Sequence, residues 1–230
     1  MTRQSGHVVH RRRGIAQALL VCFAFLAGPV ASAGAADAAS RTVRLTLAPA
    51  STLWLEGTST LHAYSSHATA ITATVEIALP AREVNPRRAL SRALREGSIE
   101  KFEFVVPVIG LKSETGGLDK NLYKALKAKQ APDIRFHLTS RSVKPSPLKP
   151  GSYVMDCAGA LTIAGQTQDI TLTADARATA TGLHITGTKQ LLMSSYGVKP
   201  PKMMLGTIKT GDKVVVHFDV TFVTAPAVVH

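Results

Sequence analysis

An all-β fold, either a sandwich or a barrel, is predicted by three features of the sequence. After residue 40, apolar and polar residues alternate with a period of two along most of the chain, which is typical of strands with one buried face. The alternation recurs in eight or nine separate runs. Turn-forming sequences separate many of these runs, among them residues 145–147 and 210–212. Many short strands joined by turns indicate a sandwich or a barrel.

Each predicted strand has one aliphatic or aromatic face and one face rich in Thr, Ser, Arg, Lys and His. The strands occupy residues 42–47, 71–79, 102–108, 134–139, 153–163, 170–177 and 213–222, with shorter runs around Trp54 and over 183–192. If the sheet closes, the apolar face turns inward, because the polar face must meet water. The inward residues that we expect to bind a ligand are Phe102, Phe104, Val106, Ile134, Phe136, Leu138, Met155 and Leu161.

Two segments break the strand pattern and are predicted to be helices. Residues 86–95 place their apolar side chains at helical spacing, with the arginines mostly elsewhere. Residues 118–128 carry leucines at i, i+4 and i+8, with lysines towards the end, where cations suit the helix dipole. Pro132 prevents this second helix from continuing. We find no internal repeat and no long linker, so one folded domain is expected over residues 41–224.

Residues 1–33 have the features of a secretory signal peptide. Four arginines and no acid precede an apolar run over residues 15–30, and Ala31-Ser32-Ala33 supplies the small residues that a signal peptidase recognises. The alternative is a membrane anchor, but the run has 16 residues and a spanning helix needs about 20. Cleavage a few residues later, before Ala39, fits equally well. We therefore expect an exported protein in which residues 34–40 form a short flexible tail.

Removal of this leader leaves 197 residues and lowers the net charge from +12 to +8. A basic protein attracts anions, such as acidic lipid head groups or a phosphorylated ligand, and export argues against nucleic acid. Cys157 is then the one remaining cysteine, so the mature monomer has no disulfide. It is either buried and inert or pairs between the chains of a homodimer, and its place in an alternating run favours burial.

The sequence gives no sign of catalytic, cofactor or metal chemistry. It has no glycine-rich phosphate loop, no paired-cysteine metal motif and no His-Glu-x-x-His motif. His137, His184 and His217 lie on the polar faces of their strands, where structural histidines are the better interpretation than metal ligands. Ser194 and Ser195 lack the flanking glycines of a nucleophile elbow. We expect a protein that is not an enzyme.

Periodicity alone leaves two kinds of interior open. A barrel of about eight strands is either filled by its own side chains or holds one small ligand. The inward face mixes bulky phenylalanines with small residues such as Ala73, Ala174 and Gly159, which leave space unless large neighbours fill it. An ordinary packed core and a container for an apolar ligand are therefore equally compatible with the pattern.

Several segments, taken in their order along the chain, resemble a known family. They are residues 56–62 (EGTSTLH), 102–113, the helix 118–128 with 131–136 (APDIRF), 159–165 (GALTIAG) and 196–201 (YGVKPP). Together they resemble the YceI-like family of periplasmic lipid- or polyisoprenoid-binding proteins, and the match spans about residues 41–224. Tyr64 stands where this family more usually has Trp, and the arginine-rich residues 82–95 resemble an insertion or local elaboration.

The resemblance implies a lipocalin-like antiparallel β-barrel of about eight strands, with a helix beside or over it and an elongated apolar pocket inside. It also implies an isoprenoid-like ligand, such as a quinone or a polyprenyl chain. Our leading hypothesis is therefore a periplasmic carrier or sequestering protein for such a lipid. The alternatives are a structural or interaction module of the envelope with a solid core and, third, a hydrolase or isomerase acting on lipid-like substrates.

Two basic clusters accompany the predicted helices: Arg87, Arg88, Arg92 and Arg95 in one, and Lys120, Lys124, Lys127 and Lys129 in the other. If either helix lies near the mouth of the pocket, its cations could meet a phosphate head group or an anionic membrane surface during loading. We favour the simpler interpretation, an ordinary solvated helix face, and keep a transient membrane-surface contact as the alternative.

Overall fold

The computed structural model describes residues 40–113, 116–200, 202–203 and 208–224. The expected signal peptide and residues 34–39 of the expected tail lie outside the described residues. No helix within the described ranges is long and apolar enough to cross a membrane.

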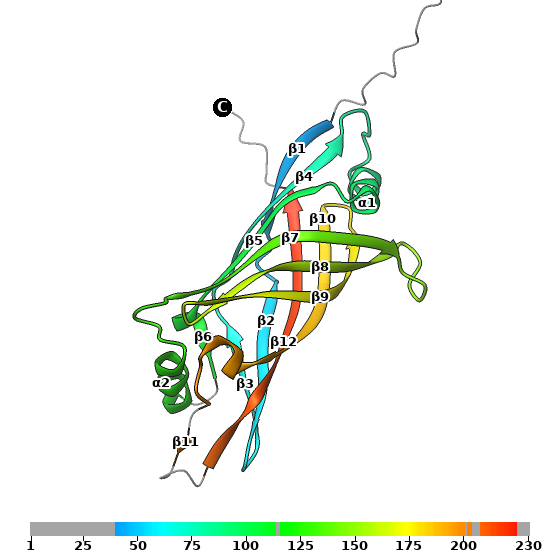
Figure 1. The fold of residues 1–230 in the computed structure, drawn as a ribbon. Helices are drawn as coiled ribbons and strands as arrows, with labels where there is room; N and C mark the ends of the chain where they lie inside the picture. The colour runs from blue at the N-terminus through cyan, green and yellow to red at the C-terminus, as the bar shows by residue number, and fades with distance from the viewer. Residues whose placement is uncertain (1–39, 114–115, 201, 204–207, 225–230) are drawn as a thin grey trace, which may run out of the picture. The chain divides into compact units, whose positions relative to one another are not determined.

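The described residues form mainly strands, with two α-helices and two short 3-10 helices between them (Figure 1). The strands are β1 (Ser40–Leu47), β2 (Thr52–Ser59), β3 (Ala63–Ala68), β4 (Thr72–Pro80), β5 (Ile99–Pro107), β6 (Leu111–Lys112), β7 (Asp133–Pro145), β8 (Ser152–Ile163), β9 (Gln166–Ala178), β10 (Gly182–Leu192), β11 (Lys202–Met203) and β12 (Ile208–Thr224). The helices are α1 (Pro86–Glu96), η1 (Val108–Gly110), α2 (Gly116–Ala125) and η2 (Met193–Tyr196).

Eight of these strands close into an antiparallel barrel, in the order β1-β4-β5-β7-β8-β9-β10-β12 and back to β1. This confirms the predicted all-β barrel. The alternation distinguishes the inner face of the barrel wall from the outer face. In β4, for example, Val75, Ile77 and Leu79 are buried, whereas Thr72 is exposed. The short strands β3, β6 and β11 lack a clear alternating pattern and were not predicted.

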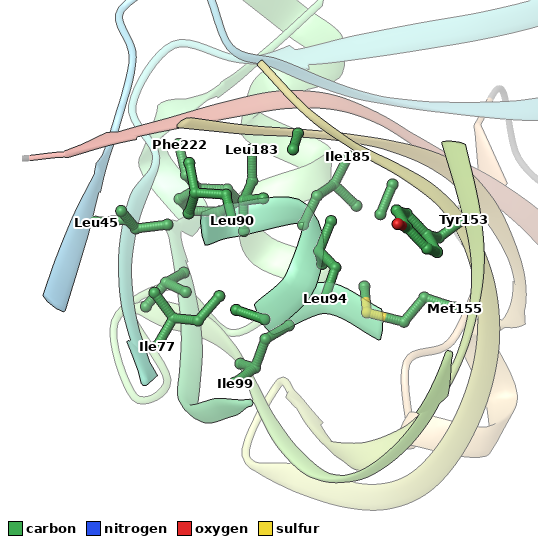
Figure 2. Close-up of a cluster of buried hydrophobic side chains, with 14 of the residues drawn as sticks. Leu45, Ile77, Leu90, Leu94, Ile99, Tyr153, Met155, Leu183, Ile185 and Phe222 are labelled. Carbon is green, nitrogen blue, oxygen red and sulfur yellow. The ribbon is translucent and has the colours of Figure 1, made fainter. Parts of the chain in front are cut away.

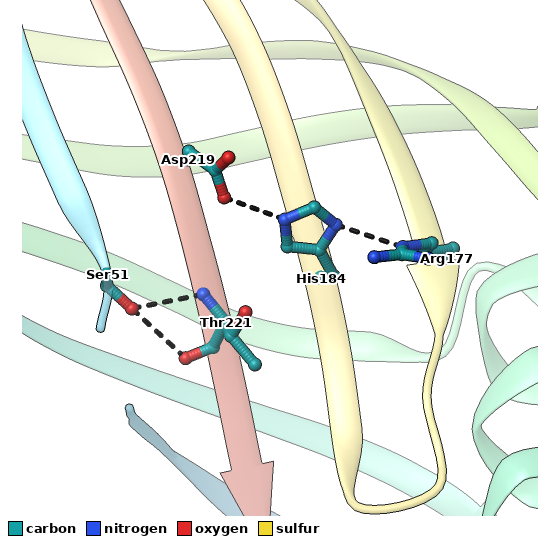
Figure 3. A network of polar contacts seen from close by, with 5 residues as sticks. All are labelled: Ser51, Arg177, His184, Asp219 and Thr221. Carbon is teal, nitrogen blue, oxygen red and sulfur yellow. Dashed lines mark hydrogen bonds and ion pairs between the residues drawn. The ribbon is translucent and has the colours of Figure 1, made fainter. Parts of the chain in front are cut away.

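Strand β12 changes partner along one edge. Residues 214–219 pair with β2, whereas residues 222–224 pair with β1. At the change, the N–H of Thr221 donates to Ser51 Oγ at 3.0 Å (Figure 3). The Thr221 carbonyl accepts from the N–H of Ala48 at 2.7 Å. These bonds keep the β12 backbone satisfied where neither strand reaches it. From β2 the sheet continues to β3 and β6, and η1 joins β6 to the end of β5.

Helix α1 fills one end of the barrel. It begins at Pro86, where the side chain of Asn85 caps it by accepting a hydrogen bond from the N–H of Arg88. It ends at Glu96, and the capping residue Gly97 has a φ of 66°, which favours glycine. Its buried face packs on strand residues such as Leu45, Ile77 and Phe222, and Figure 2 shows Leu90 and Leu94 among them. The arginine-rich segment that resembles an insertion or local elaboration therefore contributes buried residues to the core.

Helix α2 lies at the other end of the barrel, near β6 and η2 (Figure 1). It ends at Ala125, earlier than predicted, and Leu126 follows in the turn with its side chain buried. The Asp119 carboxylate accepts hydrogen bonds from the N–H and the hydroxyl of Ser113, both at 2.7 Å, and these bonds lower the pKa of Asp119. They tie the first turn of α2 to the end of β6.

We expect Leu90→Ala to lower the free energy of unfolding by about 2–5 kcal/mol, because the barrel around the helix cannot collapse fully onto the void. Leu90 is 0% exposed, whereas Leu148 is 86% exposed, so Leu148→Ala is a matched control that should change stability by less than about 0.5 kcal/mol. Urea unfolding of both variants measures the difference. Equally small effects at the two positions would contradict the role of α1 as a plug.

Candidate functional site

The barrel encloses an internal cavity of about 220 Å³. Aliphatic and aromatic side chains from the strands, from α2 and from η2 form nearly all of its lining. Phe102, Phe104 and Phe136 point inward but are only half-buried, because the space beside their rings is not filled by other side chains. The interior is therefore hollow in its middle, in contrast to the filled end around α1.

All the inward residues predicted from the sequence line this cavity: Phe102, Phe104, Val106, Ile134, Phe136, Leu138, Met155 and Leu161. The structure brings them together from β5, β7 and β8. The predicted set lacks the contributions of β2, β9, β10, β12, α2 and η2, including Leu53, Leu122 and Tyr196. For Leu122 a signal was available, because it lies on the leucine stripe of the predicted helix.

The aromatic rings of the lining are packed against one another and against glycine. The Phe102 ring meets the rings of Phe136 and Phe222 edge-on, with centroid distances of 6.2 and 5.7 Å. The Phe136 ring also lies over Gly159, where an added Cβ would come within 2.5 Å of it. The same Cβ would also meet the His137 carbonyl at 2.5 Å, so the Phe136 ring and this backbone can both approach only because residue 159 is glycine.

Tyr64 and Gly57 repeat this arrangement on the neighbouring pair of strands. They face each other directly across β2 and β3, and a Cβ at Gly57 would lie 2.3 Å from the Tyr64 ring. Gly57 belongs to the segment EGTSTLH on which the family resemblance rests, and Tyr64 is the aromatic residue that follows it. The glycine therefore allows the aromatic side chain to fold against the sheet and line the cavity.

The cavity is closed at one end and reaches the surface at the other. The buried residues of α1 seal one end, and none of them lines the cavity. At the other end the lining includes Leu192, which is 45% exposed, and the half-buried Leu122 and Met193. The mouth therefore lies beside α2 and η2.

The size of the cavity limits what it holds. It exceeds the roughly 150 Å³ apolar cavity that binds a benzene-sized molecule and is smaller than the roughly 300 Å³ at the lower end of ordinary ligand pockets. A short apolar chain fits within its 220 Å³. A longer chain must extend out of the barrel.

Few polar groups line the cavity, and burial keeps most of them neutral. Burial raises the pKa of the Cys157 thiol to about 11, with a further contribution from Asp156, and burial also raises the pKa values of Tyr64 and Tyr196. Cys157 is free and buried, as favoured from the sequence. Lys189 is the one charged side chain among the described lining residues, and its ammonium donates to the carbonyl of Thr171 at 2.5 Å.

The histidines on the predicted polar faces lie on the outer wall, away from the cavity lining. His184 Nε2 lies 2.7 Å from an Asp219 carboxylate oxygen, and its Nδ1 accepts from Arg177 at 3.0 Å (Figure 3). His217 lies 3.1 Å from Glu56 and stacks on the Trp54 ring at 4.8 Å. Within the described part of the chain, no group of three or more His, Cys, Asp or Glu residues could hold a metal ion. These contacts link neighbouring strands across the wall.

Comparison with solved structures identifies similar folds at low sequence identity. BcnA of Burkholderia cenocepacia has a TM-score of 0.54 and 14% identity, with 74% of this chain and 95% of BcnA covered. A polyisoprenoid-binding domain from Saccharophagus degradans, implicated in plant cell wall breakdown, has a TM-score of 0.55 and 10% identity, with 80% of this chain and 100% of that domain covered. No curated protein matches the sequence.

The sequence model of the YceI-like domain matches residues 57–222. This range runs from Gly57 beside Tyr64 to Phe222 at the plugged end, and so it includes nearly all of the cavity lining described above. The chain therefore belongs to the YceI-like family.

Proposed function

We propose that this protein is a non-catalytic carrier or sequestering protein that holds an isoprenoid-like lipid, of the polyprenyl or quinone type, inside its barrel. The observation that carries the proposal is the 220 Å³ cavity with its nearly uniform apolar lining. Membership of the YceI-like family and the similarity in fold to a polyisoprenoid-binding domain support the same ligand class.

The chemistry of the lining favours a hydrocarbon chain. Burial of apolar ligand surface contributes about 25 cal/mol per Å² before the costs of association. Phenylalanine rings and branched aliphatic side chains offer a chain many contacts but almost no hydrogen-bonding partner. A water-soluble ligand would lose its hydration in this cavity without compensation.

The alternatives explain the cavity less well. A module with a solid core has no use for an unfilled interior, which leaves lining side chains without packing partners. A hydrolase or isomerase needs a nucleophile or an acid-base pair beside its substrate. The polar groups of the lining are instead one thiol, whose pKa is raised by burial, two tyrosines and one lysine.

The proposed place of action is the periplasm. Support comes from residues 1–33, whose positive, apolar and small-residue regions have the order of a secretory signal peptide, and from the family to which the chain belongs. A periplasmic carrier shields an insoluble lipid from water between two membranes or membrane proteins.

Contact with a membrane surface is proposed for α2 and not for α1. The lysines of the second cluster are exposed, form no ion pair with a described carboxylate, and belong to the end of the barrel at which the cavity opens. The arginines of the first cluster belong to the plugged end, and Arg92 pairs with Glu96 at 2.7 Å. Loading from a membrane requires the mouth, and therefore α2, to face the lipid.

Leu138→Trp should fill the cavity and weaken the binding of an added polyprenol or quinone at least about tenfold, because the new ring occupies the volume of the chain. Leu148→Trp, on an exposed loop, is the matched control and should bind like the parent.

Phe136→Asp should unfold the barrel or abolish uptake, because an unpaired carboxylate in this interior is costly. Ligand titration with circular dichroism of each variant measures both effects; normal uptake by a folded Leu138→Trp or Phe136→Asp protein would contradict the proposal.

Replacement of Lys120, Lys124, Lys127 and Lys129 by Gln should weaken binding to vesicles that contain anionic lipid, because each lysine near such a surface contributes about 1 kcal/mol. The matched control replaces Arg87, Arg88, Arg92 and Arg95 by Gln and should bind much as the parent does. Vesicle sedimentation at low and physiological salt measures the difference, which should shrink as salt rises. Equal binding by the two variants would leave α2 as an ordinary solvated face.

A further inference from the structure

Lys189 is a charged residue on the apolar side of the wall. It shares its alternation phase in β10 with Leu183, Ile185 and Leu191, and it lines the cavity with the last two. Its ammonium has three donors, and its one hydrogen-bond partner among the described residues is the Thr171 carbonyl. Two donors therefore remain for another acceptor.

The carbonyl that Lys189 reaches is unpaired because β9 and β10 separate at this point. The two strands pair over five residue positions, from Leu183 opposite Ala178 to Gly187 opposite Ala174. Beyond Gly187, residues 188–192 of β10 pair with β12 only, and residues 166–173 of β9 pair with β8 only. Figure 1 shows β9 turning away from β10 below their connecting turn. The barrel wall therefore lacks one stretch of backbone ladder beside Lys189.

A polar hollow lies in the wall at this gap and adjoins the apolar cavity. It is lined by hydroxyl, amide and cationic side chains, including Ser140, Arg141, Thr188 and Gln190. The hollow and the cavity share Cys157, Leu172 and Lys189, so the two meet at the lysine. The apolar cavity and the polar hollow thus lie on the two sides of these three residues. The polar hollow also contains the carboxylate of Asp156, which already accepts a hydrogen bond from Thr173 at 2.8 Å.

A purely structural role would explain why Lys189 donates a hydrogen bond to Thr171. It would not explain why the donor is a charged side chain, since a neutral donor could make the same bond. The hydrogen bond from the Lys189 ammonium to Thr171 is exposed, so the charge stays accessible from the outer side of the wall. The cavity itself is too small for a long lipid, so the remainder of such a ligand must leave it somewhere. The mouth beside α2 and η2 provides one exit for it. The gap between β9 and β10 adds a place where a polar end of the ligand can reach a cation.

We propose that an amphiphilic ligand binds with its apolar chain in the cavity and its anionic head group, a phosphate or carboxylate, on Lys189 in the gap between β9 and β10. This inference rests on the proposed function and narrows its ligand class from neutral polyprenols and quinones to isoprenoid-like chains that end in an anion. Lys189 is the residue that sets this specificity.

The test compares farnesyl phosphate with farnesol, which share a chain and differ in the head group. Lys189→Met keeps the length of the side chain and removes its charge, and Lys189→Arg keeps the charge. Lys144→Met, at an exposed position on β7, is the matched control. Dissociation constants for both probes, with thermal unfolding of each variant, give the result.

We expect Lys189→Met to bind farnesyl phosphate at least about tenfold more weakly, the loss typical of a hydrogen bond to a charged group, and farnesol within about twofold of the parent. Lys189→Arg should keep most of the preference for the phosphate, and Lys144→Met should match the parent with both probes. If Lys189→Met binds both probes as the parent does, or loses both equally, the lysine only ties β10 to β9 and the inference is wrong. If the parent binds neither probe, the proposed function itself fails.

Discussion

Closure of the backbone hydrogen bonding around the barrel is the constraint on which the remaining features depend. Strand β12 closes the barrel, because it pairs with β10, β2 and β1. Its residues 213–223 pair with β10 along one edge. Along the other edge, residues 214–219 pair with β2 and residues 222–224 pair with β1. At the change of partner, Ala48 and Ser51 satisfy the Thr221 backbone. Because every barrel strand then has two neighbours, the strands keep one face towards water and the other towards an enclosed space.

That enclosed space is filled at one end only. Helix α1 supplies the apolar volume that closes the end formed by β1 and β4, and α2 with η2 leaves the opposite end partly open. Between them, glycines at positions 57 and 159 let aromatic rings lie close against the wall. The same closure makes the break between β9 and β10 significant, since it is a stretch of wall where a side chain, Lys189, stands in for the backbone ladder.

The sequence predicted those parts of the molecule that depend on local alternation. Phe102, Phe104, Phe136 and the other predicted inward residues line the cavity because a period of two assigns each of them to one face. Short strands such as β3 were not predicted, because Ala63–Ala68 has no apolar alternation. The role of α1 in closing the barrel was not predicted either, because it depends on long-range packing that no local pattern contains. Lys189 lies on the inward phase of its run, but the sequence does not show that the hydrogen bonding between β9 and β10 ends beside it. That end is a property of the closed sheet.

The central claim, that the barrel holds an isoprenoid-like lipid in the periplasm, is tested most directly by native mass spectrometry of the protein isolated from the periplasm. We predict a polypeptide mass that corresponds to the chain without its first 33 residues, or a few more, together with an additional mass that organic extraction identifies as an isoprenoid-like lipid. A chain that retains residues 1–33, or a processed chain that carries no lipid and takes up no added polyprenol, quinone or farnesyl phosphate, would contradict it.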